Sequence, residues 1–337
     1  MDKVRKKLLD AARLLIIAAI FWFLYSSGRL NLASIGEAAT HPGAIVSATA
    51  LLLIGMLISV ERWRLLIKAQ DIHVGLWPAL NLTLIGAFFN IVFPGAVGGD
   101  IVKAYYLAKG QQQKAALVTT VIFDRLLGLY TVIFVAALAG LGAYAYVATL
   151  PSVPPWWTPA MKGLVLFVLV FFAAYNIAGA VVMSKRLRKT RLNVFILTKM
   201  PFHDKVVKIY NSIHGFRDRP LYSLAALGLS IVSQFMMYTA LYIIAQALDI
   251  NELSPGHYMF ALPLCILINA IPLAPGGLGV GEIGFGEILS LFGSAKGVEL
   301  AVVFHIISMV LAVALGGVAY MAYGKGEQEI KSATGDN

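Results

Sequence analysis

Two short segments of this sequence hold the residues best suited to bind a charged ligand. In both, an asparagine is followed by a proline–glycine pair, spaced glycines and a carboxylate. The residues are Asn90, Pro94, Gly95, Gly98, Gly99 and Asp100 in the first, and Asn269, Pro275, Gly276, Gly277, Gly279 and Glu282 in the second. Because proline and glycine break a helix, the helix that follows begins with unpaired backbone N–H groups at its positive dipole end. That end attracts anions, phosphate above all, so we predict an anion site built twice.

Charged residues follow each break at similar distances. Lys103, Asp124 and Arg125 follow the first break, and His305 follows the second. Arg125 lies eleven residues after Lys114. That spacing places it roughly 16 Å into a helix. An unpaired arginine at such a depth in a membrane costs about 3 kcal/mol on insertion scales, so Arg125 requires a compensating group.

The compensating group for Arg125 is Asp100, Glu282 or a bound phosphate. Asp124 is not a simple partner, because adjacent side chains on a helix point about 100° apart. The alternative to a binding site is a structural one, in which an ion pair locks the broken segments to the rest of the protein.

Metal and covalent chemistry have little support in this sequence. His305 could titrate or donate to a headgroup, or it could be a satisfied core histidine. The other histidines have no ligand spacing with it, and Cys265 is the single cysteine. No HExxH, GxSxG or nucleotide-binding loop is present. We therefore expect no metal, no cofactor and no enzyme activity.

The elements that must position these residues are apolar and helical. The chain is 59% hydrophobic and 13% charged, too little charge for a soluble domain of 337 residues. Several apolar runs exceed the 18 or so residues that cross a bilayer. The runs span residues 11–27, 43–60, 78–93, 115–150, 162–183, 221–248, 258–273, 283–292 and 298–323.

The distribution of lysine and arginine predicts the topology. The net charge of +10 comes from short segments between apolar runs. This distribution is typical of a membrane protein that follows the positive-inside rule, and it argues against nucleic-acid binding. Both termini are then cytoplasmic, and residues 28–42, 150–161 and 249–256 face outward. The broken segments 78–113 and 257–297 must return to the side from which they came. If both broken segments instead crossed the membrane fully, the two termini would still lie on the same side. The lysines at 103–114 would then lie outside.

We therefore predict an all-α polytopic protein of the cytoplasmic membrane. It has about six full transmembrane helices and two re-entrant helical hairpins related as inverted repeats. The membrane domain spans residues 1–323, with repeat one at about 43–150 and repeat two at about 221–323. A basic cytoplasmic loop spans 184–220, and a short tail spans 324–337.

The chain resembles a known family, the flippase-like membrane domain of lysylphosphatidylglycerol synthases. The resemblance covers about residues 45–320. It rests on Asn90-x3-Pro94-Gly95-x2-Gly98-Gly99-Asp100 with Lys103, Asp124-Arg125-x2-Gly128, Pro272-x2-Pro275-Gly276-Gly277-Leu278-Gly279-x2-Glu282, and Glu61-Arg62-Trp63-Arg64-Leu65-Leu66. The family usually carries arginine near the position of His305, so the second half departs from its pattern. The synthases' soluble aminoacyl-transferase domain is not found in this sequence.

The resemblance implies lipid translocation rather than lipid synthesis. We expect a flippase or scramblase for an anionic phospholipid or a polyprenyl-phosphate lipid, whose headgroup meets the hairpin N-termini and Arg125 near the midplane. Expected partners are membrane lipids and a separate lipid-modifying enzyme or glycosyltransferase, with a homo-oligomer left open. The alternatives are an ion-coupled small-molecule transporter and a membrane enzyme that acts on lipid phosphates.

Overall fold

The computed structural model describes residues 22, 25–26, 32–92, 98–109, 113–183, 216–269 and 278–322. Within these ranges the regular structure is helical and contains no strand. The predicted first transmembrane helix, the C-terminal tail and most of the basic loop lie outside the described residues.

Five of the described helices are long and apolar enough to cross a membrane. They are α3 (Pro42–Lys68), α6 (Lys114–Ala148), α7 (Pro159–Met183), α10 (Pro220–Ala247) and α13 (Gly297–Leu311), which continues into the π-helical segment η3 (Ala312–Gly316). Each corresponds to a predicted apolar run, and the bounds agree within about three residues for all but α3. The prediction of an all-α polytopic membrane protein is therefore confirmed.

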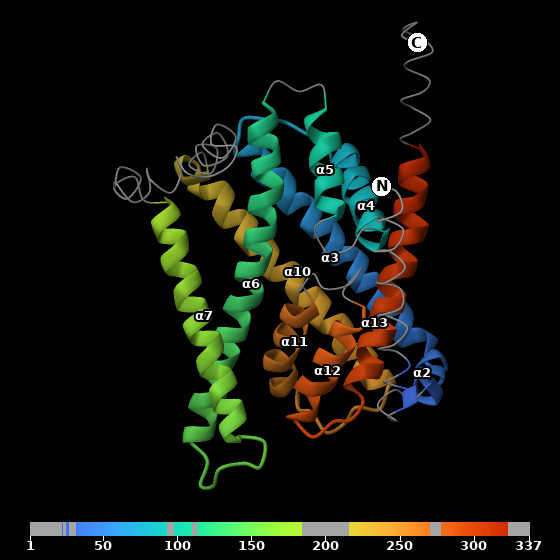
Figure 1. Ribbon diagram of the computed structural model, residues 1–337, viewed down its shortest axis with the longest axis vertical. Coiled ribbons are helices and arrows are strands. Elements are labelled where there is room, and N and C mark those ends of the chain that lie inside the picture. The colour runs from blue at the N-terminus through green and yellow to red at the C-terminus, as the bar shows by residue number, and fades with distance from the viewer. Residues whose placement is uncertain are drawn as a thin grey trace, which may run out of the picture.

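Two pairs of shorter helices form the segments that the sequence breaks. The first pair is α4 (Leu76–Val92) and α5 (Gly98–Ala108), and the second is α11 (Pro255–Asn269) and α12 (Val280–Ser290). Figure 1 shows α4 and α5 at one end of the bundle and α11 and α12 at the other. We call each pair a hairpin, and the two hairpins lie at opposite ends of the bundle. Their re-entrant course and their relation as inverted repeats stay predictions. A short helix, α2 (Leu32–Ala39), precedes α3.

The predicted end of the second apolar helix was wrong. The predicted run ends at residue 60, with Arg62, Arg64 and Lys68 after it, whereas α3 continues to Lys68. No proline or glycine interrupts this stretch, and Trp63, Leu66 and Ile67 are fully buried along it. Packing of these buried side chains stabilises the helix beyond residue 60, although the segment also contains arginines.

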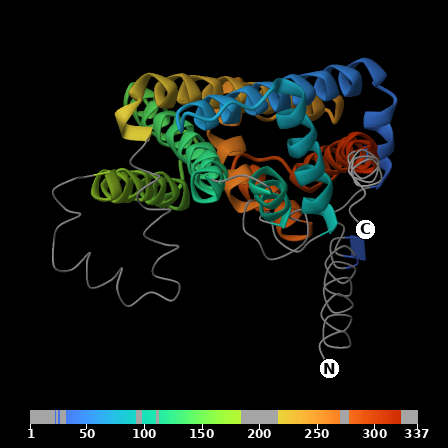
Figure 2. The same ribbon diagram turned by 90° about the horizontal axis from the view of Figure 1, so that it is seen from above.

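Helices α3 and α10 pack along each other on one side of the bundle. In the view from above they lie side by side (Figure 2). Gly55 of α3 permits this approach, because a Cβ atom there would already lie 3.4 Å from Met236 Cβ of α10. Helices α4 and α6 pack against α3, and α6, α11 and α13 pack against α10.

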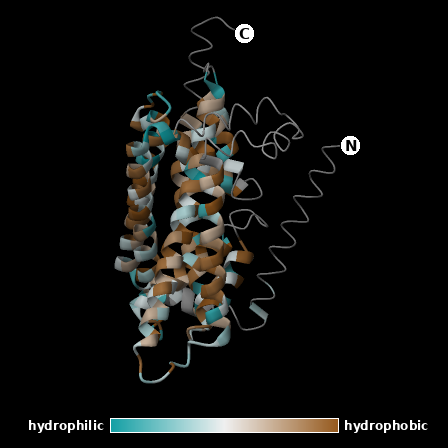
Figure 3. Cartoon of the chain, turned by 90° about the vertical axis from the view of Figure 1, so that its left-hand side faces the viewer, coloured by the Kyte–Doolittle hydropathy of each residue, from teal (hydrophilic) through white to brown (hydrophobic). Residues whose placement is uncertain are grey.

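The outer surface of the bundle suits a lipid environment. Hydrophobic residues dominate most of its length (Figure 3). Helix α7 is the clearest case, because it exposes large apolar side chains: Leu166, Phe167, Val170, Phe171 and Ile177. Such a continuous apolar face is too large for a soluble monomer.

Candidate functional site

The structure pairs each hairpin carboxylate with a basic side chain on the next long helix. Arg125 of α6 donates to the Asp100 carboxylate of α5 from two guanidinium nitrogens, Nε and Nη2. The distance from Nη2 to Oδ1 is 3.1 Å. In the second half, Oε1 of Glu282 on α12 lies 2.8 Å from Nδ1 of His305 on α13. Of the candidate partners for Arg125, Asp100 is the one that binds it. Glu282 bonds to His305 instead, because the two hairpins lie at opposite ends of the bundle.

The same backbone approach positions both carboxylates. In each half a glycine precedes the carboxylate and packs against the asparagine of the first hairpin helix. A Cβ atom on Gly99 would lie 2.8 Å from Asn90 Cγ and 1.8 Å from the Gly86 carbonyl oxygen. A Cβ atom on Gly281 would lie 2.4 Å from Asn269 Oδ1. Only glycine fits at these contacts, so the position of the following carboxylate depends on them.

The two asparagines then differ in what they bind. Asn90 Oδ1 accepts a hydrogen bond from the backbone N–H of Gly99 at 2.8 Å. Asn269 Oδ1 lies 3.0 Å from Nε2 of His305. Because Glu282 Oε2 also accepts the backbone N–H of Gly279, the second site is a continuous chain of hydrogen bonds. Gly279 has a φ of +86°, a conformation that glycine adopts at no steric cost.

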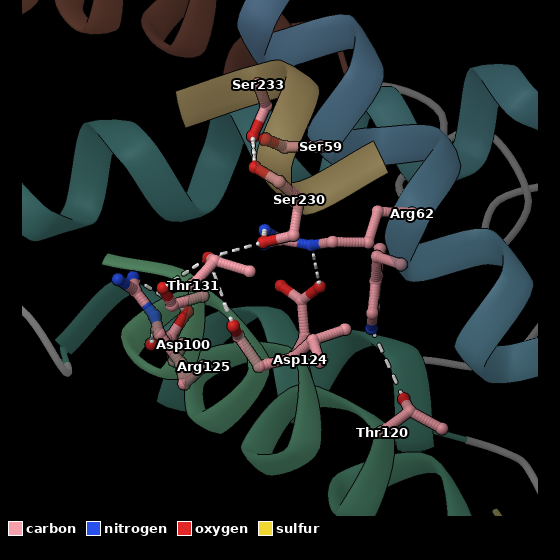
Figure 4. A network of polar contacts seen from close by, with 12 residues as sticks. Ser59, Arg62, Asp100, Thr120, Asp124, Arg125, Thr131, Ser230 and Ser233 are labelled. Atoms are coloured by element: carbon pink, nitrogen blue, oxygen red, sulfur yellow. Dashed lines mark hydrogen bonds and ion pairs between the residues drawn. The ribbon is translucent and has the colours of Figure 1, made fainter. Parts of the chain in front are cut away.

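A second ion pair lies deeper in the first half. Arg62 of α3 donates from Nε to Asp124 Oδ1 of α6 at 2.8 Å, and the two side chains are only 10% and 12% exposed. Its Nη1 donates to Ser230 Oγ of α10 at 2.9 Å. Ser230 also lies 2.9 Å from Thr131 Oγ1 of α6. Figure 4 shows this network, which joins three long helices at one point.

Lys103 completes the charged group of the first half. It is buried, and its Nζ lies 3.5 Å from the centre of the Trp63 ring in a cation–π contact. Its charge interacts electrostatically with Asp124, Asp100, Arg125 and Arg62. We call Arg62, Lys103, Arg125, Asp100 and Asp124 the charge cluster. Its three cations outnumber its two carboxylates, so these described residues carry one positive charge that no carboxylate among them balances.

The charge cluster reaches the outer surface of the bundle at Arg125. The side chain of Arg125 is 52% exposed, whereas that of Asp100 is 17% exposed. The neighbouring exposed side chains on α5 and α6 are apolar or aromatic: Ile101, Tyr105, Ile122 and Leu126. An arginine at this depth is therefore open to the side of the protein, where lipid would lie.

Several predicted site residues cannot be placed. Pro94, Gly95, Pro275, Gly276 and Gly277 lie outside the described residues. The backbone N–H groups of Gly99 and Gly279, which follow the two breaks, are described and already donate to Asn90 Oδ1 and Glu282 Oε2. Gly98 begins α5, and Gly279 immediately precedes α12. Among the described residues, no group of three His, Cys, Asp or Glu side chains could hold a metal ion.

Comparison with known proteins decides the family. The model of the lysylphosphatidylglycerol synthase TM region matches residues 11–316, which is most of the chain. This chain belongs to that family.

Other members of this family show similar coverage. A UPF0104 membrane protein of Methanothermobacter thermautotrophicus is 26% identical over 307 residues, covering 86% of this chain and 88% of the relative. A second, from Pyrococcus horikoshii, is 23% identical and covers 81% and 85%. A third, from Methanocaldococcus jannaschii, is 24% identical and covers 84% and 85%. No solved structure matches the chain significantly.

The structure adds four residues that the sequence did not predict for the site: Arg62, Ser230, Thr131 and Trp63. A signal for the first and last was present, because the resemblance quoted the run Glu61-Arg62-Trp63-Arg64. Arg62 was nevertheless expected in the short charged segment after the second apolar run, because only the structure shows that it is buried on α3. Ser230 and Thr131 are hydroxyl residues among many, and nothing in their spacing distinguishes them.

Proposed function

We propose that this protein moves a lipid with an anionic headgroup across the cytoplasmic membrane, as a flippase or scramblase without covalent chemistry. One observation carries the proposal: the charge cluster has one unbalanced positive charge, buried beside an arginine that opens toward the apolar side of the bundle. A charge at such depth is costly without a counter-ion. A lipid phosphate supplies one negative charge at that place.

The geometry favours a lipid over a freely diffusing solute. The guanidinium of Arg125 is half exposed beside Ile101 and Tyr105, which are exposed apolar and aromatic side chains. A phosphate bound to Arg125 can therefore keep its acyl or prenyl chains against this outer surface. A small-molecule transporter, the alternative, would need access to the site from water. The described contacts of Arg125 favour access from the apolar outer surface instead.

The two ion pairs of the first half have different roles in this proposal. Asp100 holds Arg125 when no lipid is bound, and the arriving phosphate takes over the guanidinium, because both form bidentate contacts with arginine. Arg62 and Asp124 are buried and joined to Ser230, so they hold α3, α6 and α10 in place. Lys103 supplies the unbalanced charge from beneath Trp63.

The proposal includes an orientation and partners. The termini are cytoplasmic, and the α4–α5 hairpin enters from the cytoplasmic side while the α11–α12 hairpin enters from outside. Transport is driven by a gradient or by a partner protein. A separate lipid-modifying enzyme or glycosyltransferase supplies or consumes the lipid.

A fluorescent-lipid assay tests the function. Purified protein is reconstituted into phosphatidylcholine vesicles that contain NBD-labelled phosphatidylglycerol, and dithionite reports how fast inner-leaflet lipid becomes accessible. Wild-type protein should accelerate this movement, and Arg125→Ala should abolish the acceleration while remaining folded. Lys114→Ala removes one exposed charge from the same helix outside the charge cluster and should behave as wild type. Equal rates in Arg125→Ala and wild type would refute the assignment of the site.

A further inference from the structure

His305 is held between two oxygen atoms. Its Nδ1 lies 2.8 Å from Glu282 Oε1, and its Nε2 lies 3.0 Å from Asn269 Oδ1. A neutral imidazole has one N–H donor and one acceptor nitrogen, so it cannot donate to both oxygens. An imidazolium donates from both nitrogens. Both bonds form only when the pair holds one proton more than a neutral His305 beside an ionised Glu282, with that proton between Nδ1 and Oε1.

Burial of the pair makes loss of this proton costly. Glu282 is fully buried and His305 is 5% exposed. If the proton leaves the pair, Glu282 is left as a buried carboxylate without a counter-charge, which is costly. Loss of the proton must therefore accompany a rearrangement of the α11–α12 hairpin or an exchange of bonding partners. The occupied and empty proton states thus favour different arrangements of the second half.

The corresponding pair in the first half cannot do this. Asp100 and Glu282 each follow a tightly packed glycine, and each binds a side chain on the next long helix. Arginine does not lose its proton in proteins, whereas histidine is the side chain that exchanges a proton near neutral pH. The two halves thus build the same ion pair, with a fixed charge at Arg125 and an exchangeable one at His305.

The surroundings of His305 contain few other ionisable groups. The elements that pack against α13 are α12, α10, α2 and η3, and Asn269 belongs to α11. Glu299 of α13 itself precedes His305 by six residues, or about 9 Å along the helix. The titratable side chains on the neighbouring elements are Glu282 and Glu287 of α12, Tyr222, Tyr238 and Tyr242 of α10, Glu37 of α2, and His257, Tyr258 and Cys265 of α11. Among the described residues, Glu282 is the ionisable group that bonds directly to His305.

Polar side chains continue along α10 from the first site. Ser230 bonds to Arg62, and Gln234 and Tyr238 follow it at intervals of four residues on the same helix face. Within the described part of the chain, buried oxygens of Gln234 and Tyr238 have no hydrogen-bond partner. Two buried polar side chains thus follow the first site along α10.

We propose that the Glu282–His305 pair is a proton-binding site, and that its loading and unloading are coupled to lipid movement. The inference rests on the proposed lipid transport and adds a second transported species to it. On loading, a ring nitrogen of His305 uses its lone pair to take a proton from hydronium, and water is released. On unloading, the N–H bond breaks and the proton returns to water on the other side. The free energy of the proton gradient then drives the lipid without nucleotide hydrolysis.

Two measurements on the full-length protein test the coupling. In vesicles with NBD-phosphatidylglycerol, an imposed pH gradient should change the rate of lipid movement by wild-type protein, and trapped pyranine should report proton movement. In weakly buffered detergent solution, short-chain phosphatidylglycerol should cause the protein to take up or release protons. His305→Arg keeps a cation beside Glu282 and should remove both proton signals.

The variants separate this inference from the proposed function. If His305→Arg does not fold, the double variant Glu282→Gln/His305→Gln keeps hydrogen-bonding groups without a charge and should also lose proton exchange. Lipid movement by wild-type protein without any proton exchange, or unchanged proton exchange in the folded variants, would overturn the coupling and leave lipid transport intact. No lipid movement in wild-type protein would overturn the proposed function itself.

Discussion

Arg62 and Asp124 form an ion pair that is buried between helices distant in sequence, with Nε and Oδ1 2.8 Å apart. The partners lie 62 residues apart, on α3 and α6, and Ser230 adds a contact from α10. The pair therefore connects three long helices, of which α3 and α6 pack against the first hairpin. Its removal should affect the whole first half rather than a single contact.

Loss of one partner of this pair should be strongly destabilising. Arg62→Ala leaves Asp124 buried without its counter-charge, which typically costs about 3–5 kcal/mol. Arg62→Met combined with Asp124→Leu removes both charges and should recover a large part of that loss. Thermal unfolding of the detergent-solubilised variants measures this difference. A double variant less stable than Arg62→Ala alone would contradict the role of the pair.

The hairpin glycines should tolerate no side chain. Gly99→Ala places a Cβ atom 1.8 Å from the Gly86 carbonyl oxygen, and Gly281→Ala places one 2.4 Å from Asn269 Oδ1. Both should lower the unfolding temperature and displace the carboxylate that follows. Gly163→Ala on α7 is the matched control, because a Cβ atom there meets nothing within 4 Å. That control should be neutral or more stable by up to about 1 kcal/mol. Equal stability of all three would contradict the tight packing.

Lys103 should determine affinity for anionic lipid more than stability. Lys103→Met keeps a long apolar stem against Trp63 but removes the charge that makes the charge cluster positive. We expect the affinity for short-chain phosphatidylglycerol to fall by about tenfold or more, which corresponds to about 1.4 kcal/mol. Calorimetry on the solubilised protein measures the affinity, and phosphatidylcholine serves as the uncharged comparison. An unchanged preference for the anionic lipid would exclude Lys103 from the site.

Several features of the fold and site follow from local sequence. Pro94, Gly95, Pro275 and Gly276 mark the two breaks because proline and glycine act on the backbone directly, whatever surrounds them. Asp100 and Arg125 lie 25 residues apart, and the structure joins them as one of the expected alternatives. The predicted runs also agree with the five long described helices, and the sixth lies outside the described residues.

The remaining features depend on packing between distant helices. Arg62 was expected in the short charged segment after the second apolar run because a positive charge at the end of an apolar run usually marks the membrane boundary. Its burial depends on Asp124 and Ser230, which lie 62 and 168 residues further along the chain. No periodicity within α3 identifies such partners. The bond between His305 and Asn269 likewise depends on how α11 and α13 meet.

The identity of the lipids retained by the purified protein tests the central claim most directly. Native mass spectrometry of wild-type protein and of Arg125→Ala and Lys114→Ala, released from detergent after mild delipidation, compares them. If the charge cluster holds a lipid phosphate, wild-type protein and Lys114→Ala should retain anionic phospholipid or prenyl phosphate, and Arg125→Ala should lose it. Retention of the same anionic lipids by Arg125→Ala, or of zwitterionic lipids alone by wild-type protein, would contradict the account.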